Sequence, residues 1–457
     1  MDDRPIVVRS YDVGFGDCVY VQIPDGEGTA FHMLIDCGTS AAGSILKPAL
    51  DDVLSMLPLE DGKRQLDLLV VTHPHADHIK GFNPAWLAGA HIRRIWLSVF
   101  MDDDHPQAEK AHALQEMAAA CAMAAAQYGA ALAPAAQALM ERSTWSINNP
   151  GALRALREEL AQSGGIQPAY PLYVARDLAP KLTQAKRRDY ALDRDQDTTR
   201  FRGFREEGTC LRVLAPEWNV DKYYLGRDLL PGSALVGRQP ADAGASPAAL
   251  PGAATGDVEP ARPANISERD FRILRGRLAT MALAFSQEDD ALKNNTSVVL
   301  LLEWRKRRLL FAGDAEWQGS GVELGRRNST WDVMLHHPEV AGLLLQPLDF
   351  LKVAHHGSHN GTPFREGGED KLRMMVSPER TQVVVSTVPG KHGDEFPVPY
   401  PPLLKVLGQL AQNGRVYPNA PEEELRQASQ PQRTDLEPQA AGASVRYVEV
   451  KVPPYPA

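Results

Sequence analysis

The segment from Asp67 to Phe82 constrains this chain more than any other part of it. Its apolar run, Leu68 to Val71, predicts a buried strand, and the sequence His-Pro-His-Ala-Asp-His follows at once over residues 73–78. Alternate side chains of an extended backbone point to the same side, so His73 and His75 are expected to face one way. Three imidazoles and a carboxylate within six residues are ligands that a borderline divalent cation such as Zn²⁺ prefers. The segment therefore predicts a metal site at a strand end, and a merely solvated polar loop is a poor alternative.

Two later strands are expected to end in residues of the same kind. An apolar run over 309–312 leads to Asp314, and another over 350–354 leads to His355 and His356. Ligands delivered from several strand ends to one edge are what a rigid two-metal site requires. We therefore expect these residues to meet the first segment in the fold.

These motifs resemble those of a known family. The pattern His-x-His-x-Asp-His at 73–78 resembles the signature of the metallo-β-lactamase fold hydrolases. Asp-Val-Gly-Phe-Gly-Asp at 12–17, Leu-Ile-Asp-Cys-Gly at 34–38 and His-His-Gly-Ser at 355–358 resemble the branch of that family that contains the DNA-uptake protein ComEC. The resemblance covers roughly residues 5–100 and 290–420. It implies an α/β fold, the αββα sandwich, with residues 1–457 as a single domain. Residues 101–290, which the resemblance leaves almost entirely unmatched, are expected to form a large helical, partly disordered insertion within it.

The resemblance also implies two divalent metal ions, Zn²⁺ or Mn²⁺, and a set of ligands for them. In that set His73 and His75 bind the first ion, Asp314 bridges the two, and the second ion is bound by Asp77, His78 and His356. A carboxylate can bridge because its two oxygens reach two cations about 3.5–4 Å apart.

Many members of the family carry a further histidine on the first ion, and no motif places it here. The candidates between the central motif and Asp314 are His91, His105 and His112. Either that ion keeps a position open to water, or its ligand comes from elsewhere. A site poor in histidine and rich in carboxylate favours Mn²⁺ over Zn²⁺.

The chemistry expected of such a site is hydrolysis. Two cations lower the pKa of a bridging water, so that hydroxide forms near neutral pH without a serine or cysteine nucleophile. Asp77 is expected to orient that hydroxide. Candidates for stabilising developing negative charge or protonating the leaving group are Lys352, His355, Ser358, His359 and His392. Asp17 and Asp36 either orient ligand histidines or cap turns.

Composition limits the setting of this chemistry. The chain has 457 residues, a formal net charge of −9 and a pI of about 5.8, which argues against a protein that coats nucleic acid. Its four cysteines are scattered, which indicates a reducing compartment. No leader segment and no apolar run of about 18 residues is visible, so we expect a soluble, cytoplasmic protein without membrane contact.

The substrate stays open at this point. The first hypothesis is a phosphodiesterase, most specifically a nuclease acting on DNA, with Arg305 to Arg308 and the arginines of 187–205 lining a groove. The second is hydrolysis of a small phosphoester or a lactone-type substrate. The third is a component of a multi-protein system, for example in defence, that binds a protein partner through residues 101–290.

The expected insertion has its own pattern. Helices are predicted over the Ala-rich residues 107–141, over 150–160 and over 271–285, with a flexible segment at 230–265. The core pattern is expected to resume as a strand over 294–303.

Overall fold

A computed structural model describes residues 3–26, 28–41, 43–102, 105–128, 170–172, 204, 209–225, 262–324, 326–388, 397–414, 416–419, 439–441 and 445–455. The expected helix over 150–160, residues 230–261 of the segment expected to be flexible, and His392 lie outside these residues.

The first sheet is built mainly from the N-terminal part of the chain. In spatial order its strands are β16 (Gln439–Ala441), β17 (Val445–Val452), β1 (Ile6–Tyr11), β2 (Cys18–Pro24), β3 (Ala30–Cys37), β6 (Leu68–Val71), β8 (Ile95–Ser98) and β9 (Tyr170–Leu172). The strands from β16 to β3 pair antiparallel, whereas β3, β6, β8 and β9 run parallel. The carboxyl ends of β3 and β6 therefore lie at the same edge.

The second sheet belongs to the C-terminal half. Its order is β10 (Cys210–Ala215), β11 (Val299–Trp304), β12 (Arg307–Phe311), β13 (Phe350–Lys352), β14 (Gln382–Val385) and β15 (Val416–Pro418). From β12 to β15 all neighbours are parallel, so their carboxyl ends also share an edge. A small third sheet holds β4 (Leu59–Glu60), β5 (Lys63–Leu66) and β7 (Ala90–Ile92).

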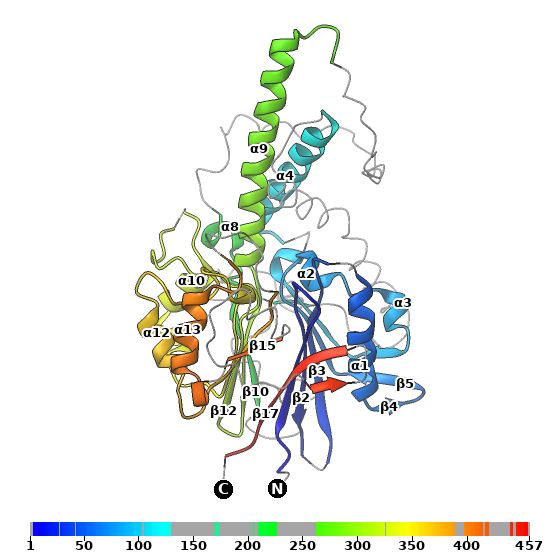
Figure 1. Ribbon diagram of the computed structural model, residues 1–457, viewed down its shortest axis with the longest axis vertical. Helices are drawn as coiled ribbons and strands as arrows, with labels where there is room; N and C mark the ends of the chain where they lie inside the picture. Colours follow the sequence, from blue (N-terminus) through cyan, green and yellow to red (C-terminus); the bar gives the residue numbers. More distant parts are fainter. Residues whose placement is uncertain are drawn as a thin grey trace.

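Apolar side chains hold the two large sheets face to face. Alternate residues of β1, β2 and β3 pack against those of β11 and β12, and Trp96 and Trp304 are fully buried between them. The outer face of the first sheet is covered by α1 (Leu46–Met56) and α3 (Pro84–Leu87). The outer face of the second is covered by α10 (Thr330–His336), α11 (Pro338–Leu344), α12 (Glu369–Met375) and α13 (Pro401–Leu410), as Figure 1 shows. The predicted αββα sandwich is confirmed.

Two helices rise from one end of this sandwich. They are α4 (Glu109–Gln127) and α9 (Glu268–Asn295), and Figure 1 shows α9 extending well beyond the sheets with α4 beside it. Small side chains let the two approach, since Ala122 and Ala125 of α4 pack on Ala282 of α9. The short α8 (Val220–Tyr223) packs against their base. That residues 101–290 form an insertion stays a prediction.

Several predicted boundaries are wrong. The strand expected over 294–303 begins only at Val299, because Asn294 and Asn295 are the last residues of α9. The helix expected over 271–285 is longer at both ends, since α9 runs from Glu268 to Asn295. The remaining short elements are η1 (Gly43–Ile45), α2 (Ala76–Ile79), η2 (Val99–Met101), η4 (His355–Gly357) and η5 (Gln412–Gly414).

Within the described residues, no helix combines the length and apolarity needed to cross a membrane.

Candidate metal centre

The ligand-type residues stand where parallel strands end. Thr72 and His73 follow β6, Asp314 follows β12, and His355 and His356 follow β13. His75 then caps the start of α2, whose first turn carries Asp77 and His78. The chain therefore turns directly after β6, so that the ligand-type residues before and after the turn both face the second sheet.

The structure brings all six predicted ligands together. His73, His75 and Asp314 form one group of donor atoms within 4.8 Å of one another, and Asp77, His78 and His356 form another. Asp314 lies between the groups, with its Oδ2 3.8 Å from Nε2 of His73, 3.3 Å from Nε2 of His78 and 3.6 Å from Nε2 of His356. All six side chains are buried.

Acceptors behind the rings determine which nitrogens face the centre. Thr72 Oγ1 donates its one hydrogen to Asp36 Oδ2 at 2.6 Å, so it accepts from Nδ1 of His73 at 3.1 Å. Asp36 Oδ2 accepts from Nδ1 of His78 at 2.7 Å. Because the Nδ1 atoms carry the protons of these hydrogen bonds, His73 and His78 present Nε2 to Asp314. Asp36 thus contacts a candidate ligand histidine, which is the first of the two roles expected for it.

The His-His-Gly turn orients His356 in the same way. His355, His356 and Gly357 have φ angles of +49°, +54° and +78°, and two non-glycine residues in this region together cost a few kcal/mol. The turn places Nδ1 of His356 3.2 Å from the carbonyl oxygen of Ser386, which can only accept. Nε2 of His356 therefore faces Asp77 Oδ2 at 3.5 Å as well as Asp314.

The chemistry of these residues fits divalent cations. Among the described residues, Nε2 of His78, Nε2 of His356 and Oδ1 of Asp314 are buried and lack a hydrogen-bond partner, although a buried polar atom without one is costly. Ligand bonds of about 2.0–2.2 Å put neighbouring donors about 3.3–3.6 Å apart in a tetrahedral site. The separations of 3.3–3.8 Å around Asp314 are close to that range.

The charges in the cluster balance one another. Burial lowers the pKa of His78, but Asp314 and Asp36 outweigh burial and hold that pKa well above its ordinary value. Burial favours a higher pKa for Asp314, but His78, His356 and His355 hold it well below its ordinary value. Burial, with His78 and His75 nearby, keeps the pKa of His73 well below its ordinary value. Without a cation, a protonated His78 offsets the negative charge of Asp314 and Asp36. A bound cation would take over that role and displace the proton from the nitrogen that binds it.

Asp17 and Lys352 support the centre from behind. Nζ of Lys352 lies 3.0 Å from Asp17 Oδ2 in a buried ion pair, and Ser386 donates to Asp17 Oδ1. Burial favours a higher pKa for Asp17, but Lys352 and His356 bring it below its ordinary value. The charged group of Lys352, a candidate for stabilising developing negative charge or protonating the leaving group, is buried on Asp17 and is not among the described residues that line the cavity.

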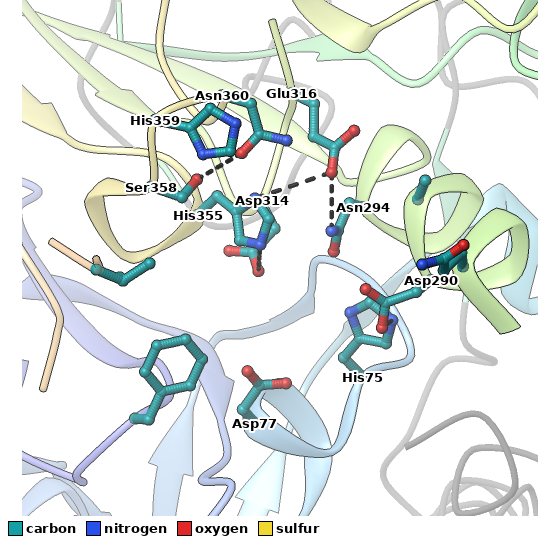
Figure 2. Close-up of a pocket in the computed structure, with 14 residues that line it drawn as sticks. His75, Asp77, Asp290, Asn294, Asp314, Glu316, His355, Ser358, His359 and Asn360 are labelled. Atoms are coloured by element: carbon teal, nitrogen blue, oxygen red, sulfur yellow. Dashed lines mark hydrogen bonds and ion pairs between the residues drawn. The ribbon is translucent and has the colours of Figure 1, made fainter. Parts of the chain in front are cut away.

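A cavity of about 350 Å³ opens onto the donor atoms. Its wall carries the predicted residues His75, Asp77, Asp314, His355, Ser358 and His359 (Figure 2). Sequence reasoning missed five further polar or acidic side chains that line it: Gln287, Asp290, Asn294, Glu316 and Asn360. Glu316 accepts from Nδ2 of Asn294 at 3.1 Å and from Nδ2 of Asn295 at 2.8 Å. The repeated amide pair Asn-Asn was the signal available for this contact.

The three candidates for a further histidine ligand lie elsewhere. His91 pairs with Gln65 at 2.7 Å, His105 with the carbonyl of Trp218 at 2.7 Å, and His112 with the carbonyl of Phe100 at 2.9 Å. None belongs to the groups of potential metal ligands. The basic hairpin Arg305 to Arg308 lies at the start of β12, whereas Asp314 follows the other end of that strand. Arg307 binds Asp349 at 2.7 Å and is not among the described residues that line the cavity, so a role of this hairpin in a substrate groove stays a prediction.

Comparison with known proteins identifies part of this arrangement. The family model of the metallo-beta-lactamase superfamily matches residues 11–90, which include β2, β3, β6 and the His-x-His-x-Asp-His loop. No curated protein matches the chain. The family match and the two groups of donors together indicate a metal-dependent hydrolase.

Proposed function

We propose that this chain is a dinuclear metal-dependent phosphodiesterase. The observation that carries the proposal is the pair of buried donor groups on either side of Asp314, at the floor of an open cavity. In this assignment His73 and His75 hold the first ion and Asp314 bridges. The second ion is held by Asp77, His78 and His356. Zn²⁺ and Mn²⁺ both accept such a mixture of imidazole and carboxylate.

Two such ions, when bound, supply activation of water and neutralisation of negative charge on a phosphoryl group. The residues around them supply position and protons. Asp77 has one carboxylate oxygen 3.5 Å from His356, and its side chain also borders the cavity, so it can orient a water that enters there. Asp36, Thr72 and the carbonyl of Ser386 fix the rings of His78, His73 and His356 beforehand, which lowers the cost of reaching the reactive arrangement.

His355 is the proposed proton donor to the leaving group. Its side chain is 23% exposed, lies on the cavity wall and stands 4.0 Å from Asp314 and 3.9 Å from Glu316. From this position an imidazole can pass a proton to an oxygen of a ligand that enters the cavity. His392 is proposed as a second such group.

The substrate is proposed in two forms. DNA follows from the resemblance of residues 355–358 and 12–17 to the ComEC branch. A small phosphodiester is favoured by the cavity itself, since about 350 Å³ suits a small ligand and no lysine or arginine stands among the described residues that line it. A DNA-binding groove would instead neutralise several phosphates with basic side chains.

One experiment separates these forms. The full chain, loaded with Mn²⁺ or Zn²⁺, is incubated with bis-p-nitrophenyl phosphate and with linear, circular and single-stranded DNA. The double variant Asp77→Ala/His78→Ala is the control, and metal content is measured for both proteins. Turnover of either substrate by the parent alone supports the proposal, and DNA cleavage that weakens steeply with salt supports the nuclease form. Equal activity of parent and control, or a parent that binds no metal, contradicts it.

A further inference from the structure

Helix α9 forms one wall of the cavity. Its last turns contribute Gln287, Asp290, Ala291 and Asn294 to the lining. Figure 2 shows Asp290 beside His75, and its Oδ1 lies 3.4 Å from Nε2 of that ring. A carboxylate far along the chain from the central motif, and outside the matched residues 11–90, therefore contacts one of the proposed ligands of the first ion.

The two nitrogens of His75 face different neighbours. Nδ1 lies 2.9 Å from Nε2 of His73, whereas Nε2 faces Asp290. Because Thr72 holds the Nδ1 proton of His73, the Nε2 of His73 offers a lone pair. At 2.9 Å the two nitrogens form a hydrogen bond in which Nδ1 of His75 is the donor. To bind a cation together with Nε2 of His73, Nδ1 of His75 has to give up that proton. In neutral imidazole the proton then resides on Nε2, where it requires an acceptor.

We propose that Asp290 is a positioning residue for the first ion: its carboxylate accepts the Nε2 proton of His75 and so leaves Nδ1 free to bind the metal. The inference rests on the proposed function. With it, the four ligand imidazoles follow one rule, since each outer nitrogen faces an oxygen acceptor. These acceptors are Thr72 for His73, Asp290 for His75, Asp36 for His78 and the Ser386 carbonyl for His356. Acceptors of this kind set tautomer and ring orientation at metal sites.

The end of α9 is held firmly enough for this role. Asp289 and Lys293 form an ion pair at 2.5 Å with both side chains fully buried. Asn295 accepts from the backbone amide of Thr330 at 2.8 Å and donates to Glu316. These contacts fix the helix on both sides of Asp290, so the carboxylate is delivered by a rigid element and not by a loop.

The test compares Asp290→Ala and Asp290→Asn with the parent, all as full chains stripped of metal. Glu288→Gln is the matched control, because Glu288 lies on the same helix, pairs with Arg327 at 2.6 Å and does not line the cavity. Zn²⁺ affinity for each of two equivalents is measured by competition with a chromophoric chelator, and the visible absorption of bound Co²⁺ reports the ligand environment. Melting of the metal-free proteins shows that each variant is folded.

We expect Asp290→Ala to weaken one equivalent by about 10–100-fold and to leave the other within about twofold. Asp290→Asn should recover most of that loss, because its amide oxygen still accepts a proton, and Glu288→Gln should match the parent. Two results overturn the inference: unchanged binding by Asp290→Ala, or an Asp290→Asn loss as large as that of alanine, which would make Asp290 a direct ligand. A parent that binds no metal overturns the proposed function itself, whereas a parent with two equivalents and an unaffected alanine variant overturns only this role.

Discussion

Replacing Asp36 by asparagine should impair the second metal group while leaving the fold intact. Asp36 has a φ of +56°, a conformation that asparagine also adopts, so the backbone is not expected to resist the change. The carboxylate accepts from Thr72 N at 2.8 Å, from Thr72 Oγ1 at 2.6 Å and from His78 Nδ1 at 2.7 Å. An amide keeps one oxygen for Thr72 N and presents its NH₂ group to the other two atoms.

That substitution reverses the tautomer of His78. Nδ1 must then accept, the proton moves to Nε2, and the nitrogen that lies 3.3 Å from Asp314 loses its lone pair. Loss of such a supporting acceptor typically lowers metal affinity 10–100-fold, or about 1.4–2.7 kcal/mol. Chelator competition with Zn²⁺ at fixed pH measures this change for each equivalent.

The control is Asp52→Asn. Asp52 also accepts two hydrogen bonds, from Tyr11 at 2.7 Å and Arg9 at 3.0 Å, but on α1 away from the donor atoms. It should leave both affinities unchanged. If Asp36→Asn melts like the parent without metal and still binds both equivalents within twofold of the parent, the argument from ring orientation is refuted.

Three further predictions concern stability. Burial, with Arg93 nearby, lowers the pKa of His32 to about 4, so the unfolded chain binds more protons between pH 6.5 and 4 and stability falls as pH falls through that window. The loss is about 2 kcal/mol at pH 5 relative to pH 7.5, and denaturant titrations should show a smaller loss for His32→Gln; an equal loss in both would contradict this. Gly38→Ala would place a Cβ 2.2 Å from the backbone of Asp77 and His78, so it should cost about 3 kcal/mol and abolish tight metal binding, unlike Gly89→Ala, whose Cβ meets no atom within 4 Å. Removing Zn²⁺ held at 100 times its Kd should lower the unfolding free energy by about 2.7 kcal/mol without unfolding the sandwich, whereas an unchanged melting temperature after chelation would argue against bound metal.

The residues of the central site could be predicted because the sequence signals for them lie close together or directly after apolar runs. His73 to His78 stand in one short segment, and Asp314, His355 and His356 each follow an apolar run whose strand character is plain. Parallel pairing then brings those strand ends to one edge, as the structure shows.

The wall of the cavity could not be predicted from the same signals. Asn294 and Asn295 precede a strongly apolar run and have low helix propensity, which favoured a strand start over a helix end. The helical period does continue to that point, since the buried residues of α9 include Ala282, Phe285, Asp289 and Leu292. Asp289 interrupts the apolar face of α9, and its burial there is tolerated because Lys293 neutralises its charge. That both side chains are fully buried is seen only in the folded helix.

Helix α9 is unbroken from Glu268 to Asn295, and 28 residues of α-helix extend about 42 Å. Its inner end touches the histidine cluster and its outer end stands clear of the sheets (Figure 1). One continuous helix therefore connects the wall of the cavity with a surface that lies outside the sandwich.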